Sequence, residues 1–418
     1  MSTSVEKQHE KIEQRFIIRK CPEYADLVCP AHALETSFDG WFALKEAYSS
    51  KLVETLLKEI KNDQDVIIID PFSGSGSTLV GARNARASKG IGIEINPFFQ
   101  LLEKAKMTPV DTLKVRKEIK IVLKNAFSSK IDIDPPKLEI IGKVFEENLQ
   151  PILRVKSEIE KMNDENIHDF MMAGLGCILE KVGTSVKDGN GLKYPGNKIK
   201  TDVRESLVAQ YRRMLIDMSM LQNKHFDHEI VKGDCRNVSL PDRDVTHCIF
   251  SPPYANCFDY TEVYKVELWT LEFVKDYDEM KILRERSLSS HLNKQYSNVD
   301  PPRIEIKELI DSIEWEKTWG KAKNRNMLSS YFNDMKSVFL KMNGAIVENG
   351  FLACIVGNSA YGGVVIPTDL FLSLILEDCG FSVKEIRVTR KLKTSSQQTK
   401  RLKYNNYLRE SIVVARKN

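Results

Sequence analysis

The 418-residue sequence contains no run of eighteen consecutive apolar residues. A membrane-spanning helix needs about twenty predominantly apolar residues, so the sequence predicts no transmembrane segment. The segment 1–20 is highly charged, whereas a secretory signal peptide has a continuous apolar stretch. We therefore expect a soluble, cytoplasmic protein.

Cysteine and histidine are too scattered to indicate a metal site. The eight cysteines include no Cys-x-x-Cys pair, and no histidines cluster at metal-ligand spacing. We expect reduced, mostly buried thiols and no structural zinc. The cysteines occupy positions 21, 29, 177, 235, 248, 257, 354 and 379.

The chain has little net charge, but the charge is unevenly distributed. The formal value is +4, and the segment 381–418 holds eleven Lys and Arg against two Glu, a local +9. Subtraction leaves −5 for the first 380 residues. A basic terminal segment on a near-neutral body can bind phosphates, and a solvated charged tail is the alternative.

An apolar stretch and a glycine-rich turn indicate a nucleotide-binding layout. Residues 66–69 are apolar at every position, as in a central parallel strand covered on both faces. The sequence then runs Asp70-Pro71-Phe72-Ser73-Gly74-Ser75-Gly76. A helix over 78–87 and a strand over 90–94 complete a β-α-β unit.

Two common glycine-rich motifs do not match this turn. A P-loop has lysine after its last glycine, but Ser77 follows Gly76 here. The dinucleotide fingerprint needs a third glycine, which is missing. The ATPase and dehydrogenase interpretations are therefore weakened.

Acidic residues stand at the ends of three expected strands, over 66–69, 90–94 and 229–234. Glu94 is placed to accept both hydroxyls of a ribose, and an exposed strand-end glutamate is the alternative. Asp70 is placed to meet a positive amino group of the ligand. Asp234 is placed to accept from an adenine amino group, and a turn-forming Gly-Asp pair is the alternative.

A second motif, Ser251-Pro252-Pro253-Tyr254, follows a short apolar strand over 246–250. It predicts a flat polar slot with an aromatic wall, suited to an exocyclic amino group. Two prolines and an aromatic residue also make an ordinary rigid turn. The glycine-rich turn at 70–76 favours the first interpretation, a slot for an exocyclic amino group.

Together the two motifs resemble those of S-adenosylmethionine-dependent amino-methyltransferases of DNA. The serine form of the tetrapeptide is similar to that of the cytosine-N4 group, whereas adenine-N6 enzymes usually have Asp or Asn at the position of Ser251. The resemblance covers most of 30–106 and 229–418. Carbon-5 cytosine methylation needs a cysteine nucleophile, usually in a Pro-Cys dipeptide. The sequence contains no Pro-Cys dipeptide.

The resemblance implies an α/β fold, with a Rossmann-like class I methyltransferase sheet that carries helices on both faces. It implies S-adenosylmethionine as cofactor and methyl transfer to N4 of a cytosine flipped out of double-stranded DNA. The setting implied is restriction-modification or host DNA marking, with a cognate restriction endonuclease as a candidate partner. The alternatives are adenine-N6 methylation, methylation of an RNA base and a non-catalytic nucleic-acid-binding module.

The resemblance also implies roles for individual residues. Catalysis falls to the slot, where the Ser251 hydroxyl and the Pro252 carbonyl accept from the amino group and Tyr254 stacks on the base. The predicted catalytic residues are Ser251, Pro252, Pro253 and Tyr254. The predicted cofactor-binding residues are Thr36, Asp70, Phe72, Ser73, Gly74, Ser75, Gly76, Glu94 and Asp234.

The sequence predicts three parts. Residues 1–106 form the cofactor-binding half of the catalytic domain, 107–228 a helical insertion, and 229–418 the half with the base pocket. Within the last part we expect a loop-rich polar excursion over 275–328 and a basic C-terminal segment. The nucleic-acid-binding residues expected there are Arg387, Arg390, Lys393, Gln397, Gln398 and Arg401.

The glycine turn precedes the tetrapeptide, whereas many cytosine-N4 enzymes have the reverse order. The chain is therefore a different permutation, and the insertion, the excursion and the basic segment are all candidates for target recognition. Further elements are expected in the C-terminal part. They are helices over 259–269, 329–347 and 369–378, a strand over 351–356, and a hairpin of 382–389 with 411–415.

Overall fold

The computed structural model describes residues 4–45, 47–60, 65–137, 139–189, 191–221, 226–240, 243–392, 402 and 406–418. Within these residues, no helix is long and apolar enough to cross a membrane.

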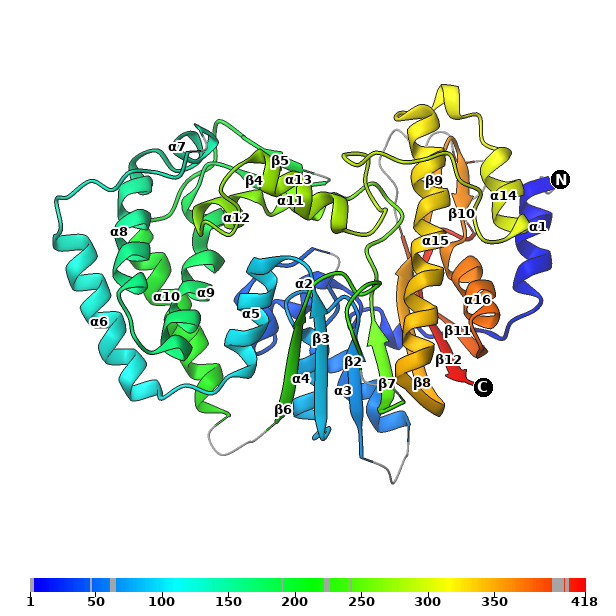
Figure 1. The fold of residues 1–418 in the computed structure, drawn as a ribbon, viewed down its shortest axis with the longest axis horizontal. Helices are drawn as coiled ribbons and strands as arrows, with labels where there is room; N and C mark the ends of the chain where they lie inside the picture. The colour runs from blue at the N-terminus through cyan, green and yellow to red at the C-terminus, as the bar shows by residue number, and fades with distance from the viewer. Residues whose placement is uncertain are drawn as a thin grey trace.

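An eight-stranded sheet crosses the molecule (Figure 1). Strand β12 is antiparallel to both of its neighbours, and the other pairings are parallel. This arrangement is a Rossmann-like class I methyltransferase sheet, so the predicted fold class is confirmed. In spatial order the strands are β1 (Ile18–Lys20), β11 (Phe381–Lys391), β12 (Arg409–Lys417), β8 (Ile346–Gly357), β7 (Val245–Phe250), β2 (Ile67–Asp70), β3 (Lys89–Glu94) and β6 (Asp227–Lys232).

Helices cover both faces of the sheet because its strands are apolar on both sides. Successive side chains of a strand point to opposite faces. Ile68 accordingly packs in a cluster with α3 and α4, whereas Ile69 packs in a cluster with α15 and α16. These helices are α3 (Ser50–Glu59), α4 (Ser77–Asn84), α15 (Lys321–Ala345) and α16 (Thr368–Asp378).

The segment 107–228 adds a helical lobe, on the left of Figure 1. One apolar cluster contains residues of this lobe together with Leu79 of α4 and Phe98 of α5, so the lobe shares a core with the cofactor-binding half. The elements concerned are α5 (Pro97–Met107), α6 (Thr112–Ser128), α7 (Glu139–Phe145), α8 (Leu149–Glu160), α9 (Glu165–Val182), β4 (Val186–Asp188), β5 (Gly191–Lys193) and α10 (Val203–Ser219).

The predicted hairpin of 382–389 with 411–415 is confirmed by the antiparallel pairing of β11 and β12. The helix predicted over 259–269 is in fact two, α11 (Tyr260–Val263) and α12 (Lys265–Thr270). They are separated at Tyr264, whose φ of −107° and ψ of 19° are not helical. The apolar periodicity of this segment did not reveal the break.

The prediction that residues 275–328 are rich in loops was wrong in part. This segment contains α13 (Tyr277–Arg286) and α14 (Ile304–Asp311), and α15 begins at Lys321 rather than near 329. Asp276 caps α13 by accepting from the Glu279 amide. In α13 only Met280 is buried, so a surface helix with almost no apolar stripe was mistaken for a loop.

The remaining elements are short or peripheral. They are α1 (Ser4–Glu13), η1 (Pro22–Tyr24), α2 (Pro30–Ala33), η2 (Asp39–Trp41), η3 (Glu146–Asn148), η4 (Trp315–Lys317), β9 (Ser359–Tyr361) and β10 (Val364–Ile366).

A buried lysine connects the helical lobe to the catalytic part. The Lys187 ammonium on β4 lies 2.5 Å from Glu267 Oε1 of α12 and 3.2 Å from Glu180 Oε2 of α9. It also lies 4.6 Å from the centre of the Phe42 ring, a cation–π contact. Both Lys187 and Glu267 are almost fully buried.

Lys187→Met should therefore destabilise the fold by about 3–5 kcal/mol, because it leaves the Glu267 carboxylate buried without its partner. The measurement is urea unfolding followed by circular dichroism. Lys193→Met on the same hairpin is the control, since its ion pair with Asp188 is exposed and its loss should leave the midpoint unchanged. Equal midpoints for the two variants would contradict the prediction.

Candidate functional site

A pocket opens at the carboxyl ends of β2, β3, β6 and β7, where ligands bind in open α/β sheets. The glycine turn contributes Phe72 and Gly74 to its lining, and the tetrapeptide contributes Ser251 and Pro253. Glu94 also lines it. The fold thus brings together the two motifs that are far apart in the sequence.

The glycine turn depends on backbone conformations and space that suit glycine. Gly74 and Gly76 have φ values of +53° and +85°. A Cβ atom at Gly76 would lie 2.9 Å from Glu103 Cγ. The predicted Ser73 and Ser75 support this turn from within, because the Ser73 hydroxyl donates to Glu103 Oε2 (2.8 Å) and the Ser75 carbonyl accepts from Lys106 Nζ (2.6 Å).

Glu94 connects the end of β3 to the turn after β2. Its carboxylate accepts from the Gly74 amide at 2.8 Å and from the Asn96 amide at 2.6 Å. Burial raises the pKa of Glu94 to about 7, although these backbone donors lower it. Glu94 therefore changes charge near neutral pH at the pocket wall.

The Asp70 carboxylate is bonded within the protein, whereas its predicted role is to meet a positive amino group of the ligand. Its carboxylate accepts from the Phe72 amide (2.8 Å) and from the hydroxyls of Tyr48 and Thr78. Burial raises its pKa to about 6. These donors give Asp70 a supporting role in the turn that the sequence did not predict.

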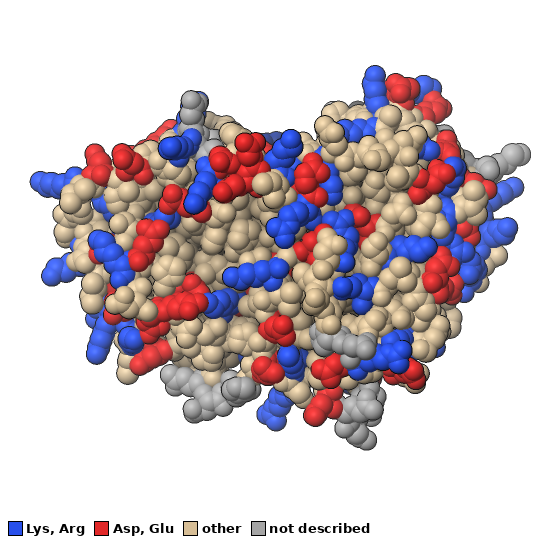
Figure 2. Space-filling view, viewed as in Figure 1, with Lys and Arg blue, Asp and Glu red and all other residues tan. Residues whose placement is uncertain are grey.

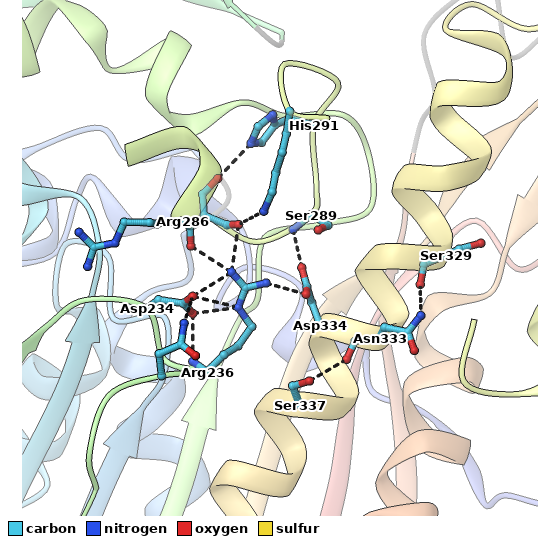
Figure 3. A network of polar contacts seen from close by, with 12 residues as sticks. Asp234, Arg236, Arg286, Ser289, His291, Ser329, Asn333, Asp334 and Ser337 are labelled. Carbon is cyan, nitrogen blue, oxygen red and sulfur yellow. Dashed lines mark hydrogen bonds and ion pairs between the residues drawn. The ribbon is translucent and has the colours of Figure 1, made fainter. Parts of the chain in front are cut away.

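Asp234 lines the pocket, but its carboxylate is already engaged (Figure 3). Arg236 donates to both of its oxygens, through Nε at 2.9 and 3.1 Å and through Nη2 at 2.9 Å. Arg236 also pairs with Asp334 of α15 at 2.5 Å. This arrangement favours the alternative of a turn-forming aspartate over that of a free acceptor for adenine.

The same arginine holds a segment that covers the pocket. Arg236 Nη2 donates to the Arg286 carbonyl (3.1 Å), and Asp334 accepts from the Ser289 amide (3.0 Å). Residues Ser287, Leu288, Ser290 and His291 of this segment line the pocket. Sequence reasoning missed them because they follow a polar helix and carry no motif.

His291 is a structural member of this segment. Its Nε2 lies 3.0 Å from Ser287 Oγ, and its Nδ1 accepts from the Asn293 amide at 3.3 Å. Burial lowers its pKa, although Asp259 raises it. The ring is thus neutral near pH 7 and its two nitrogens hold the loop.

The tetrapeptide places an unsatisfied hydroxyl at the pocket. Ser251 Oγ is buried and has no hydrogen-bond partner among the described residues. Leaving such a group unpaired costs about 1–3 kcal/mol, so a ligand that donates to it would recover that cost. Tyr254 is buried and donates from its hydroxyl to Glu410 (2.7 Å).

Residues that precede the glycine turn also reach the pocket. The predicted Thr36 donates from its hydroxyl to the Ala33 carbonyl (2.8 Å) and to Asp39 Oδ2 (2.9 Å). The pocket is instead lined by Leu44 and Lys45, a few residues further on. Lys45 is held by its amide, which donates to the Tyr264 hydroxyl at 2.9 Å.

Two of the predicted nucleic-acid-binding residues are engaged in ion pairs. Arg387 pairs with Glu59 (2.6 Å) and Glu385 (2.7 Å), and Arg390 pairs with Glu410 (2.5 Å). Figure 2 shows acidic and basic side chains interspersed on the face in view. The remaining four, Lys393, Gln397, Gln398 and Arg401, lie outside the described residues.

Comparison with known proteins supports the resemblance. No protein-family model matches the chain. The type II methyltransferase M.BsoBI of Geobacillus stearothermophilus is 25% identical over 441 residues, covering 90% of this chain and 85% of the relative. M.AvaI of Anabaena variabilis, also a type II methyltransferase, is 28% identical over 432 residues, covering 90% and 86%.

Among solved structures, geranyl diphosphate C-methyltransferase from Streptomyces coelicolor A3(2) aligns over 98% of both chains with 7% identity. Its TM-score is 0.33, so the fold assignment depends on the strand order given above. The relatives of this chain confirm the resemblance predicted from the two motifs and, with it, S-adenosylmethionine as the cofactor.

If Glu94 accepts the ribose hydroxyls, as the sequence predicts, cofactor affinity should depend on pH. Its pKa near 7 means that the carboxylate is progressively protonated between pH 8 and pH 6, so binding should weaken as the pH falls. Glu94→Gln should bind about tenfold more weakly at pH 8 and show no such dependence. Calorimetric titration with S-adenosylhomocysteine measures both, and Glu229→Gln, an exposed glutamate on β6, is the control. A flat profile for the native protein would contradict this role.

Proposed function

We propose, from the premise that this chain is a relative of type II methyltransferases, that it methylates N4 of cytosine in DNA with S-adenosylmethionine as methyl donor. The observation that carries the proposal is the Ser251 hydroxyl, buried at the pocket without a partner among the described residues. A group of this kind is suited to accept a hydrogen bond from an exocyclic amino group.

The residues at the pocket fit the cofactor. Gly74 and Gly76 let the backbone approach a ligand closely, and Glu94 offers a carboxylate where a ribose would lie. Phe72 and Leu44 provide apolar surface beside them. When bound, S-adenosylmethionine supplies a sulfonium methyl group, which is electrophilic.

The proposed role of the slot follows from the weak nucleophilicity of cytosine N4. The lone pair of cytosine N4 is delocalised into the ring, so the amino group attacks poorly. Two fixed acceptors, Ser251 Oγ and the Pro252 carbonyl, would favour a more tetrahedral nitrogen and free the lone pair. Proline fixes φ in the tetrapeptide, so these acceptors are preorganised. Holding base and donor in line would supply much of the rate.

The similarity to type II methyltransferases supports DNA as the substrate and restriction-modification as the setting. We place target recognition in the helical lobe, the 275–328 segment or the basic C-terminal segment. The predicted extrusion of the base from the duplex costs a few kcal/mol, which contacts from these segments would offset. Adenine N6 is the second candidate substrate, since both reactions methylate an exocyclic amino group on a flat aromatic ring and differ in the ring that carries it.

Ser251→Ala should lower the methylation rate by about a hundredfold or more, as loss of one preorganised hydrogen-bonding group does in other enzymes. Binding of S-adenosylhomocysteine should persist. The measurement is mass spectrometry of nucleosides from DNA treated with methyl-labelled S-adenosylmethionine. Ser373→Ala, which removes a buried hydroxyl of α16 bonded to the Asp369 carbonyl, is the control and should keep activity.

N4-methylcytosine that disappears in Ser251→Ala would support both the reaction and the slot. N6-methyladenine would retain the mechanism and overturn the choice of base. If DNA of varied sequence carried neither product, while methylated RNA appeared, the proposed substrate would be wrong.

A further inference from the structure

Three strands contribute one residue each to a row at the edge of the sheet next to the slot. Gly357 at the end of β8 lies opposite Glu410 of β12, and Glu410 lies opposite Arg390 of β11. Residues paired in this way across neighbouring strands have side chains within reach of one another. The row therefore sets glycine, carboxylate and guanidinium side by side.

The ring of Tyr254 lies on this row. A Cβ atom at Gly357 would be 2.7 Å from Tyr254 Cε2, so the glycine leaves the space that the ring occupies. The phenol hydroxyl donates to Glu410 Oε1 at 2.7 Å. Arg390 Nε donates to the other oxygen, Oε2, at 2.5 Å. Each carboxylate oxygen of Glu410 thus has a defined partner.

Burial strengthens the contact between Tyr254 and Glu410. Glu410 is 3% exposed and Tyr254 is 7% exposed, so neither hydrogen bond competes freely with water. A charge-assisted bond to a carboxylate is roughly twice as strong as a neutral one. Tyrosine has two side-chain torsions, and a bond at the tip of the ring restricts both. The ring is therefore held along one side by β8 and at its tip by β12.

We propose that Glu410, neutralised by Arg390, is a positioning residue that fixes the Tyr254 ring for contact with the target base. The inference deepens the proposed function and rests on it, since Tyr254 belongs to the tetrapeptide assigned to the base. It makes the reversed strand β12 part of the substrate site. It also gives Arg390 a role within the protein, different from the nucleic-acid contact predicted from the sequence.

The first test is steady-state kinetics of Glu410→Gln with DNA and S-adenosylmethionine. We expect kcat/KM for DNA to fall about ten- to a hundredfold, as a small displacement of a positioning group does, while the KM for S-adenosylmethionine is unchanged. Gly357→Ala displaces the ring from its other side and should give the same pattern with Glu410 intact.

The chain supplies a matched control. Glu13 accepts from the Tyr407 hydroxyl (3.1 Å) and from Arg409 Nη1 (2.7 Å), the same three residue types in another place. Glu13→Gln should leave kcat/KM for DNA unchanged. A loss equal to that of Glu410→Gln would mean that any such ion pair acts through general stability, and would overturn the proposal.

A double-mutant cycle isolates the path through the phenol. In a Tyr254→Phe background, which lacks the hydroxyl, Glu410→Gln should cause no further loss of kcat/KM, because coupled residues are not additive. A loss as large as in the native background would show that Glu410 acts by another route.

Nuclear magnetic resonance of protein with ring-labelled tyrosine separates this inference from the proposed function. The Tyr254 signal is identified by its absence in Tyr254→Phe. It should shift in Glu410→Gln and stay in place in Glu13→Gln. If the native protein fails to methylate DNA, the proposed function is wrong, whereas an unshifted Tyr254 signal in Glu410→Gln overturns the positioning role.

Discussion

The hydrogen bond from the Gly74 amide to the Glu94 carboxylate joins the ends of β2 and β3, and the shape of the pocket depends on it. The amide can point at Glu94 because Gly74 has a positive φ. The bond also holds a carboxylate at the pocket wall, where burial raises its pKa to about 7. One contact therefore sets both the geometry of the turn and the charge that a ligand meets.

Several buried or partly buried ion pairs hold the protein together around this turn. Arg236 connects Asp234 to Asp334 and fixes the segment that covers the pocket, and Lys187 joins the helical lobe to the catalytic part. The Ser251 hydroxyl lines the pocket and is buried without a partner among the described residues, which fits its proposed role as an acceptor for the substrate.

Strands β2, β3, β7 and β8 were predictable because they contain short apolar runs, and the predicted pairing of 382–389 with 411–415 was confirmed by β11 and β12. The three-residue strands β1, β4, β5, β9 and β10 were not predicted. The two motifs also identified the pocket, since Phe72, Gly74, Ser251 and Pro253 line it, together with the predicted Glu94. Helix α13 and the start of α15 were not predicted, because both segments are polar and bury few residues. Thr36 is not among the residues that line the pocket, and its role in cofactor binding stays a prediction.

The sequence by itself determined the two motifs, because they depend on local spacing of apolar residues, glycine and proline, and the fold class followed from the resemblance that these motifs carry. The tertiary structure decided which charges meet. Arg236 pairs with Asp334 of α15, and Tyr254 bonds to Glu410, 156 residues away. Such contacts depend on how strands and helices pack, and no local pattern in the chain records them.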